Sequence, residues 1–368
     1  MKKTAFHQQH LDSGAKMVEF AGFHMPLQYS GLIKEHLAVR ENMGIFDVSH
    51  MGEIWAKGPA ALDFVQKITS NDASVLYDGK VQYSCFPNGR GGIVDDLLVY
   101  KVDDQSYLMV VNAANIEKDW NWCMEQGKAF GLKPGEGLYN ASPETAQLAV
   151  QGPEAMKLVQ KLTSDSVEDM EFYTWKWVEL AGEKDVLIST TGYTGSGGCE
   201  LYMKNESGPR IWDALFEAGR DAGLVPAGLA ARDTLRLEMG FCLYGNDIDA
   251  STSPIEAGLG WITKFVPGND FIDREFLARQ KEEGVTRRLR GFVMKEKGIP
   301  RQHYEICNEH GDNIGVVTSG TMSPSLRVPI GMGYINKEYM KFGAEIFVKI
   351  RNKLLKAEVV KLPFYKGA

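Results

Sequence analysis

Residues 91–100 read Gly-Gly-Ile-Val-Asp-Asp-Leu-Leu-Val-Tyr, a glycine turn that runs into a strand-like stretch containing two adjacent acids. Neighbouring side chains of an extended chain point to opposite faces, so we expect one of Asp95 and Asp96 to face the interior or a cleft and the other to meet solvent. A buried carboxylate must be paired or hydrogen-bonded, and sites of proton chemistry commonly tolerate that cost. Two interpretations stand: a catalytic acid, or a strand-end acid held by the backbone N–H groups of the glycine turn.

The segments around this stretch predict an antiparallel meander, because they combine β-branched and aromatic residues with intervening turn residues. Its strands are expected over residues 82–86, 93–102 and 107–112. Helices are expected over residues 59–70 and about 114–130, the second with apolar side chains at three- and four-residue spacing. Strands and helices intermix without regular alternation, which predicts an α+β fold.

A second block follows residue 137, with strands expected over 147–151, 186–191 and 200–204 and helices over 210–222 and 229–239. Residues 281–290 are rich in charge and are predicted to form a linker. The basic cluster Arg287-Arg288-Leu289-Arg290 within it is either part of this solvated linker or a patch that steers an acidic carrier protein. Short strands with Gly and Asn turns then continue to Phe364 and predict a small β-barrel or β-sandwich.

The composition is that of a globular protein of two to three domains, with 368 residues of which 44% are hydrophobic. A net charge of −7 argues against a nucleic-acid binder dominated by phosphate contacts. The first three residues carry positive charge, but no apolar segment follows them, and no run approaches the ~20 apolar residues of a membrane span. We therefore expect a soluble cytoplasmic protein.

Cysteine and histidine spacing argues against a metal site. The five cysteines are scattered without a Cys-x-x-Cys pair and are expected to be small buried hydrophobes. No His-x-His or His-Glu-x-x-His pattern occurs, and His50 is expected to be a hydrogen-bonded structural histidine. Neither a Gly-x-Gly-x-x-Gly nor a phosphate-binding loop opens a helix, so nicotinamide, flavin and nucleoside-triphosphate interpretations lose support.

Residues 190–200, Thr-Thr-Gly-Tyr-Thr-Gly-Ser-Gly-Gly-Cys-Glu, form a glycine-rich loop with an acid on the returning strand. Glycines let a backbone approach a flat ligand, while Tyr193 offers a ring and Glu200 two acceptor oxygens, so a planar, nitrogen-rich heterocycle would fit. The alternative is a hairpin with solvent-facing Tyr193 and Glu200. In the next helix, Arg232, Asp233 and Arg236 can equally form a charged ladder on an exposed surface.

Taken together, these segments resemble the aminomethyltransferase (T-protein) family of the glycine cleavage system along nearly the whole chain. The matching stretches are Gly-Ala-Lys-Met-Val-Glu-Phe-Ala-Gly at 14–22, Met-Gly-Ile-Phe-Asp-Val-Ser-His-Met-Gly at 43–52, the acid-containing segment at 91–97, Val-Asn-Ala-Ala-Asn-Ile-Glu-Lys-Asp at 111–119, Thr-Gly-Tyr-Thr-Gly at 191–195, Ala-Arg-Asp-Thr-Leu-Arg-Leu-Glu at 231–238, Leu-Tyr-Gly-Asn-Asp at 243–247 and Thr-Ser-Gly-Thr-Met-Ser-Pro at 318–324.

The resemblance implies a three-domain, cloverleaf-like fold with tetrahydrofolate in a central channel. Two folate-binding domains interleave in sequence, residues 1–50 plus 141–242 and residues 51–140 plus 243–275, and residues 282–368 form the barrel domain. The implied reaction transfers the aminomethyl carbon from the lipoyl arm of the H-protein to tetrahydrofolate. The implied partners are the lipoylated H-protein, the glycine decarboxylase (P-protein) and dihydrolipoamide dehydrogenase, with no nucleic acid and no membrane.

The resemblance also implies roles for individual residues. Asp96 matches the catalytic acid, and Asp95 is assigned to structure. Glu200 matches the acid that binds the pterin edge, and Arg232 the arginine that completes that polar site. Further folate contacts are implied at Met51, Tyr83, Asn112, Tyr173 and Tyr193. The resemblance also implies two departures: many relatives have an acidic pair where this chain has Ser196-Gly197, and most have Thr-Leu-Gly where it has Ser325-Leu326-Arg327.

Two alternatives use a similar fold. A folate-dependent demethylase of a methylated amine or sulfonium compound would keep the folate channel and change the donor side. A non-catalytic folate-binding protein of iron–sulfur maintenance should carry a Lys-Gly-Cys-Tyr motif, which this sequence lacks.

Overall fold

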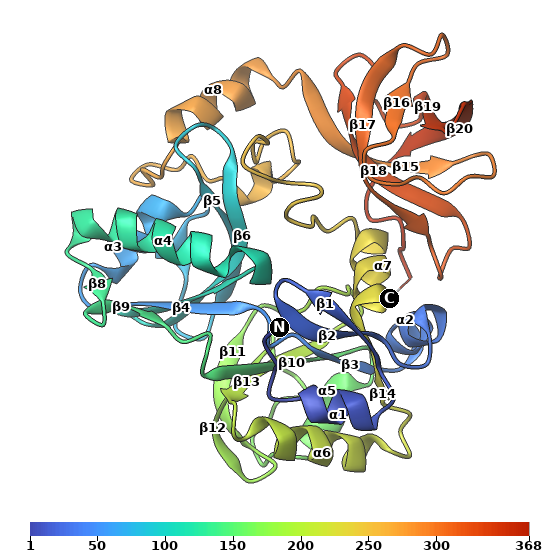
Figure 1. Cartoon of the computed structure of the whole chain (residues 1–368). Coiled ribbons are helices and arrows are strands. Elements are labelled where there is room, and N and C mark those ends of the chain that lie inside the picture. Colours follow the sequence, from blue (N-terminus) through green and yellow to red (C-terminus); the bar gives the residue numbers. More distant parts are fainter. Residues whose placement is uncertain (368) are drawn as a thin grey trace.

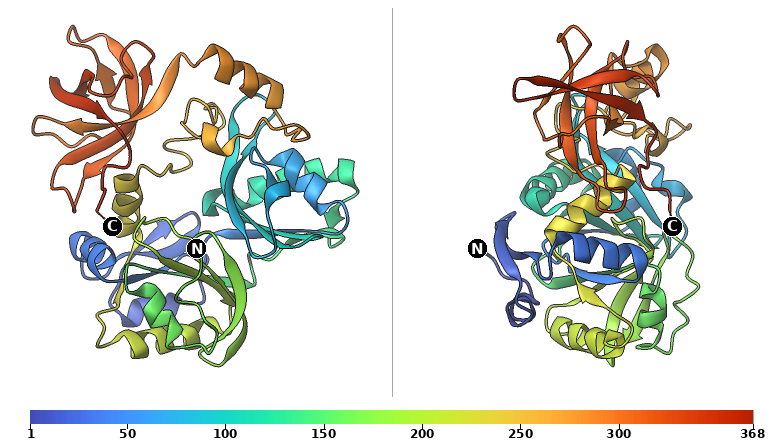
Figure 2. Two further views of the ribbon diagram at one scale, coloured as in Figure 1. Left: turned by 180° about the vertical axis from the view of Figure 1, so that it is seen from behind. Right: turned by 90° about the vertical axis from the view of Figure 1, so that its right-hand side faces the viewer.

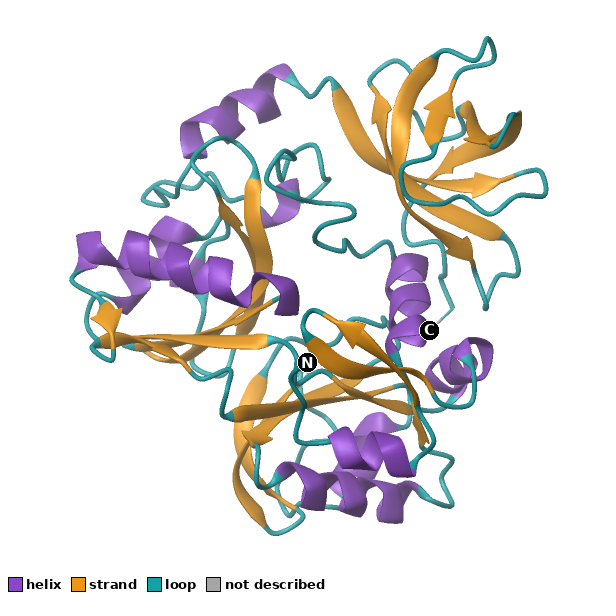
Figure 3. Cartoon of the chain, viewed as in Figure 1, coloured by secondary structure: helices purple, strands orange, loops and turns teal. Residues whose placement is uncertain are grey.

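The computed structural model describes residues 1–367 and contains two open six-stranded sheets, a closed six-stranded barrel and a small two-stranded sheet. The three larger bodies lie around a common centre (Figure 1), and the views from behind and from the side show the same arrangement (Figure 2). Helices lie mainly on the outer sides of the two open sheets (Figure 3). This architecture confirms the predicted α+β class and the C-terminal barrel.

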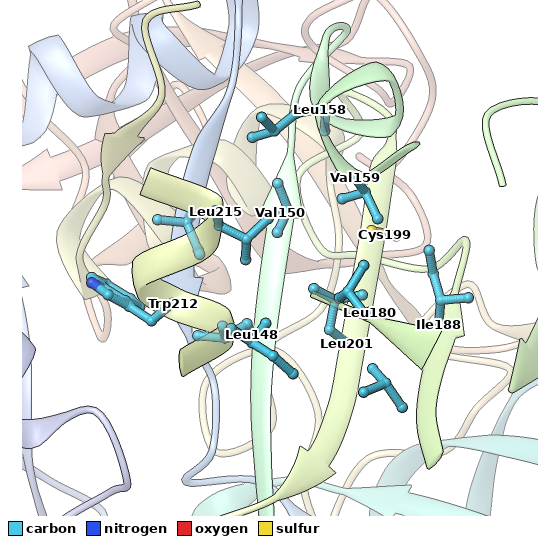
Figure 4. Close-up of a cluster of buried hydrophobic side chains, with 14 of the residues drawn as sticks. Leu148, Val150, Leu158, Val159, Leu180, Ile188, Cys199, Leu201, Trp212 and Leu215 are labelled. Carbon is cyan, nitrogen blue, oxygen red and sulfur yellow. The ribbon is translucent and has the colours of Figure 1, made fainter. Parts of the chain in front are cut away.

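The first open sheet has the order β11-β12-β13-β10-β3-β14, and only the pairing of β14 with β3 is parallel. Alternation along β10 and β13 packs Leu148, Val150 and Leu201 under helices α5 and α6 (Figure 4), which leaves Gln147 and Glu200 on the opposite face. The elements are β3 (Gly44–Asp47), β10 (Thr145–Gln151), α5 (Ala155–Gln160), β11 (Trp175–Leu180), β12 (Glu183–Ser189), β13 (Gly198–Lys204), α6 (Gly208–Gly219) and β14 (Val225–Pro226).

The second open sheet has the order β5-β6-β7-β4-β9-β8, and its first three strands are the predicted antiparallel meander. Along β6, Leu97 packs under helices α3 and α4, whereas Leu98 packs toward side chains of the first sheet. Asp95 therefore lies on the helix-covered face and Asp96 on the face toward the first sheet. The elements are β4 (Gly52–Lys57), α3 (Ala61–Ile68), β5 (Val81–Pro87), β6 (Ile93–Asp103), β7 (Ser106–Val111), α4 (Ile116–Gly127), β8 (Lys133–Pro134) and β9 (Gly137–Asn140).

The C-terminal barrel is antiparallel throughout and closes in the order β15-β18-β17-β16-β19-β20. The predicted linker over residues 281–290 is wrong, because helix α8 (Arg274–Glu283) ends within it and β15 begins at Arg287. The barrel strands are β15 (Arg287–Met294), β16 (Glu305–Cys307), β17 (Asn313–Met322), β18 (Pro329–Asn336), β19 (Glu345–Ile350) and β20 (Lys353–Val360).

Helix α7 (Leu229–Met239) connects the first sheet to the barrel through buried charges. The predicted surface ladder is wrong for Arg236, which is buried and pairs with Asp247 (Nη1–Oδ2 2.7 Å) and with Ser319 of the barrel (2.8 Å). The remaining elements are α1 (His7–Asp12), β1 (Lys16–Phe20), β2 (Phe23–Gln28), α2 (Leu32–Glu41) and the short 3₁₀ turns η1 (Ala73–Val75), η2 (Ala113–Asn115), η3 (Lys128–Phe130) and η4 (Gly260–Ile262). None of the helices within residues 1–367 has the length and apolar character needed to span a membrane.

Candidate active site in the central cavity

A cavity of about 640 Å³ lies where the two open sheets, α7 and the barrel meet. Strands β5, β6, β13 and β15 all contribute side chains to its wall. All eight residues predicted for the site line it: Met51, Tyr83, Asp96, Asn112, Tyr173, Tyr193, Glu200 and Arg232. The fold therefore gathers residues from distant parts of the chain around one space, while their individual roles stay predictions.

The Asp96 carboxylate faces the cavity and accepts hydrogen bonds from two side chains. Tyr83 Oη donates to Oδ2 (2.8 Å), and Asn112 Nδ2 donates to Oδ1 (2.8 Å). Burial and the neighbouring Asp95 raise the pKa of Asp96 to about 7, although these two hydrogen bonds lower it. Asp96 can therefore gain or lose a proton near neutral pH, which suits a general acid or base.

Asp95 is fully buried on the opposite face of β6, which corrects the expectation that the second acid would meet solvent. Its Oδ2 accepts from the backbone N–H of Asn112 (2.9 Å), and its Oδ1 accepts from the side-chain amides of Asn112 (2.9 Å) and Asn115 (2.6 Å). The N–H groups of the glycine turn donate to other side chains, so the interpretation that the turn holds one of the two acids is also wrong. Asp95 is a buried, hydrogen-bonded part of the framework behind Asp96.

Glu200 lies on β13 with its carboxylate buried at the cavity wall. Its oxygens accept hydrogen bonds from the Thr191 hydroxyl and from Gln147 Nε2 (3.3 Å). Burial raises the pKa of Glu200, while the Thr191 hydrogen bond and the positive charge of Arg232 lower it. The alternative of a hairpin with a solvent-facing Glu200 is wrong.

Tyr193 and Arg232 form a stacked pair in the cavity wall. The Arg232 guanidinium lies over the Tyr193 ring, 4.8 Å from its centroid, and the Tyr193 hydroxyl donates to the Cys242 carbonyl. Among the described residues, Arg232 makes no ion pair, and its only side-chain hydrogen-bond contact is with Met51 Sδ (3.9 Å). Its remaining donors are free to bind a ligand.

Sequence reasoning missed several further lining residues. Trp261 packs beside Tyr83 (ring centroids 5.9 Å apart), and Arg288 and Arg290 enter the cavity from β15. The Arg288 side chain has a buried Nε without a hydrogen-bond partner in residues 1–367, and burial together with Arg288 lowers the pKa of Arg290. The basic cluster at residues 287–290 can be recognised in the sequence. That two of its side chains face a cavity follows only from the folded structure, in which these residues form a strand of the barrel.

His50 differs from its predicted role. It is buried against Phe20 (ring centroids 5.3 Å apart), and its Nδ1 has no hydrogen-bond partner within the part of the chain that the structure describes. Burial and the nearby Arg232 lower the pKa of His50 to about 3, so the ring is neutral near pH 7. The five cysteines are all buried and unbridged, as predicted.

The two departures from the family pattern lie outside the cavity wall and meet at one buried ion pair. Arg40 of α2 and Glu238 of α7 are 3.0 Å apart. Ser196 accepts a hydrogen bond from Arg40 (2.7 Å), and the Ser325 hydroxyl donates to Glu238 (2.8 Å). Both departures therefore affect the junction of α2, α7 and the barrel.

Comparison with known proteins gives a consistent result over the whole chain. Residues 6–266 match the GCVT N-terminal domain, and residues 287–366 match the glycine cleavage T-protein C-terminal barrel domain. The chain is 59% identical to an aminomethyltransferase of Bacteroides fragilis and 55% identical to one of Flavobacterium psychrophilum, each over 366 residues that cover 100% of both chains. The structure superposes with a TM-score of 0.90 on the crystal structure of glycine cleavage system aminomethyltransferase T from Bartonella henselae, at 32% identity, covering 100% of this chain and 98% of that one.

Proposed function

The chain belongs to the glycine cleavage T-protein family, and from this membership we propose that it transfers an aminomethyl group from the lipoyl arm of the H-protein to tetrahydrofolate. The products are 5,10-methylenetetrahydrofolate, ammonia and the dihydrolipoyl arm. The main support from the molecule is a single cavity that contains both a carboxyl able to exchange protons near neutral pH, Asp96, and a buried acid close to a cation, Glu200 with Arg232.

The polar wall at Glu200 suits the pterin ring of tetrahydrofolate. The carboxylate keeps acceptor capacity beyond its bonds to Thr191 and Gln147, and a pterin offers its 2-amino group and a ring N–H as two parallel donors. The aromatic rings of Tyr173 and Tyr193 supply flat apolar surface beside it. A substrate that is planar and rich in N–H donors is therefore favoured.

The cavity wall formed by β15 suits the other end of the same substrate. Arg288 and Arg290 bring two guanidinium groups into the cavity, and neither makes an ion pair among the described residues. Guanidinium groups bind carboxylates with paired hydrogen bonds, and the tail of tetrahydrofolate carries carboxylates. The cavity thus contains a buried acid and two unpaired basic side chains, which match a substrate with a heterocycle and an anionic tail.

The chemistry requires proton transfer more than covalent catalysis by the protein. The folate nitrogens form two bonds to the transferred carbon, while its bonds to sulfur and to nitrogen break. The two folate N–H hydrogens end on the lipoyl sulfur and on ammonia. In its ionised form Asp96 can accept a proton and stabilise positive charge that develops at the carbon and nitrogen, and Tyr83 and Asn112 fix its orientation.

The test is reconstitution with the purified chain, aminomethylated H-protein and tetrahydrofolate. We expect equal amounts of ammonia and 5,10-methylenetetrahydrofolate, with no turnover when H-protein lacks its lipoyl group. If the chain demethylated a methylated amine or sulfonium compound in the presence of tetrahydrofolate and ignored the H-protein, the demethylase alternative would hold. If it bound tetrahydrofolate and turned over none of these donors, a non-catalytic folate-binding role would replace the proposal.

A further inference from the structure

A further buried acid, Asp119, lies behind Asp95 and Asp96, and its carboxylate accepts no hydrogen bond from residues 1–367. It belongs to α4, is fully buried, and neither carboxylate oxygen has a hydrogen-bond donor among residues 1–367. It makes no ion pair there either, and the carboxyl of Asp95 is close enough to raise the pKa of Asp119 both by its charge and by a shared hydrogen bond. Two ionised carboxylates cannot share a buried contact of this kind.

Asp95 is the acceptor of this contact, because its other neighbours are all donors. The backbone and side chain of Asn112 and the side chain of Asn115 donate to it. Three hydrogen bonds stabilise a carboxylate, so the charge resides on Asp95 and the proton on Asp119. Burial and the negative charge of Asp95 both raise the pKa of Asp119, in agreement with this assignment.

Asn112 connects this pair to the proposed catalytic acid. Its side-chain Nδ2 donates to Asp95 Oδ1 (2.9 Å), to Asp96 Oδ1 (2.8 Å) and to the Asp96 carbonyl (3.0 Å). The orientation of this amide therefore depends on a fixed, ionised Asp95. A loose or protonated Asp95 would release Asn112 and, with it, one of the two donors that hold Asp96.

We propose that Asp119 is a positioning residue: its protonated carboxyl donates to Asp95, which in turn fixes Asn112 against Asp96. The proposal rests on the proposed role of Asp96. The other titratable groups near Asp119 are Asp96 of β6, Lys118 and Cys123 of α4, and Tyr244. Of these only Lys118 carries positive charge, and its ammonium lies over the Tyr244 ring, 4.0 Å from the centroid.

The first experiment measures the proton itself and needs no activity. Difference infrared spectra of wild type and Asp119→Asn near pH 7 should contain the carbonyl band of one protonated carboxyl in the wild type only. The absence of that band would overturn the assignment of the proton, whatever the protein catalyses.

The second experiment compares two variants with the same branching at Cγ in the aminomethyl-transfer assay. Asp119→Leu removes the donor and should lower kcat about 10-fold to 100-fold with little change in KM for tetrahydrofolate, because it misplaces a catalytic group. Asp119→Asn supplies a neutral amide donor and should recover most of that loss. It should also leave the acidic midpoint of the pH–rate profile in place, since one neutral donor replaces another.

The outcomes separate the proposal from its rivals. If Asp119 were ionised, Asp119→Asn would remove a negative charge and move the acidic midpoint to lower pH. If Asp119 only filled space, both variants would lose activity in proportion to their melting temperatures, with the midpoint unchanged in each. A wild type without aminomethyl transfer would count against the proposed function, while the infrared result would still show whether the Asp95–Asp119 pair holds a proton.

Discussion

Asp95 and Asp96 are chemically identical neighbours, and their surroundings give them different behaviour. Asp96 faces a cavity, where Tyr83 and Asn112 orient it, whereas Asp95 is enclosed by three amide donors on the helix-covered face. Alternation along β6 predicted that the two side chains would diverge. It could not predict that helix α4 covers the second face, because that depends on residues far along the chain.

The first prediction at this scale concerns Asp96→Asn. The amide keeps the size of the carboxylate but can neither accept a proton nor stabilise positive charge, so kcat should fall about 100-fold or more. The dissociation constant for tetrahydrofolate, measured by isothermal titration, should change little. As the pH drops below about 7, kcat/KM of the wild type should fall with the slope of a single protonation, because protonation removes the ionised form of Asp96.

Asp95→Asn is the matched comparison for this prediction. It places an amide donor against the donors of Asn112 and Asn115, so it should lower the melting temperature and, by releasing Asn112, lower kcat by less than Asp96→Asn does. Parallel losses of activity and stability in both variants would mean that the two acids share a structural role. A wild-type profile without an acidic limb near neutral pH would remove Asp96 as the proton-transfer group.

At the scale of elements, the sequence predicted those whose apolar pattern is regular. The β5–β7 meander, α4, α7 and the barrel agree with the predicted elements within a few residues. The prediction of a linker over residues 281–290 failed for a physical reason. A cavity-lining strand with Arg288 and Arg290 has the same composition as an exposed charged linker. Only the pairing of β15 with β18 and β20 distinguishes the two, and pairing is a long-range property.

The second prediction belongs to the loop and strand that place Glu200. Glu200→Gln puts an amide donor where a pterin would also present donors, and an unpaired buried donor costs ~1–3 kcal/mol. Tetrahydrofolate affinity should therefore weaken about tenfold or more. Arg232→Ala should have a similar effect, and the double variant should lose less than the sum if both residues contact one heterocycle.

Glu183→Gln is a suitable control, since Glu183 lies on the same sheet but pairs with Arg210 away from the cavity (2.8 Å). Its affinity for tetrahydrofolate should match the wild type. Equal and small effects in all these variants would show that Glu200 and Arg232 do not bind the heterocycle.

At the scale of the whole molecule, the cavity exists because three bodies meet. The junction depends on buried charges: Arg236 joins α7 to Asp247 and the barrel, and Arg40 pairs with Glu238 beside Ser325. Removing one partner of such a buried pair typically costs ~3–5 kcal/mol, because it leaves an uncompensated charge. No local sequence pattern could predict these contacts, since the partners lie on segments far apart in the chain.

The last prediction separates two roles for the basic side chains of β15. If Arg288 binds the anionic tail of tetrahydrofolate, Arg288→Ala should weaken folate binding about tenfold, the effect of losing one hydrogen-bonded charge. Arg287→Ala removes the same charge from the adjacent position, but Arg287 pairs with Glu256 (3.2 Å) and does not line the cavity, so folate affinity should be unchanged. If the cluster instead steers an acidic carrier, both variants should reduce the salt dependence of turnover equally and leave the folate dissociation constant intact. A change in affinity confined to Arg288→Ala would assign that side chain to the substrate, because both variants remove one guanidinium from β15 and only that of Arg288 lines the cavity.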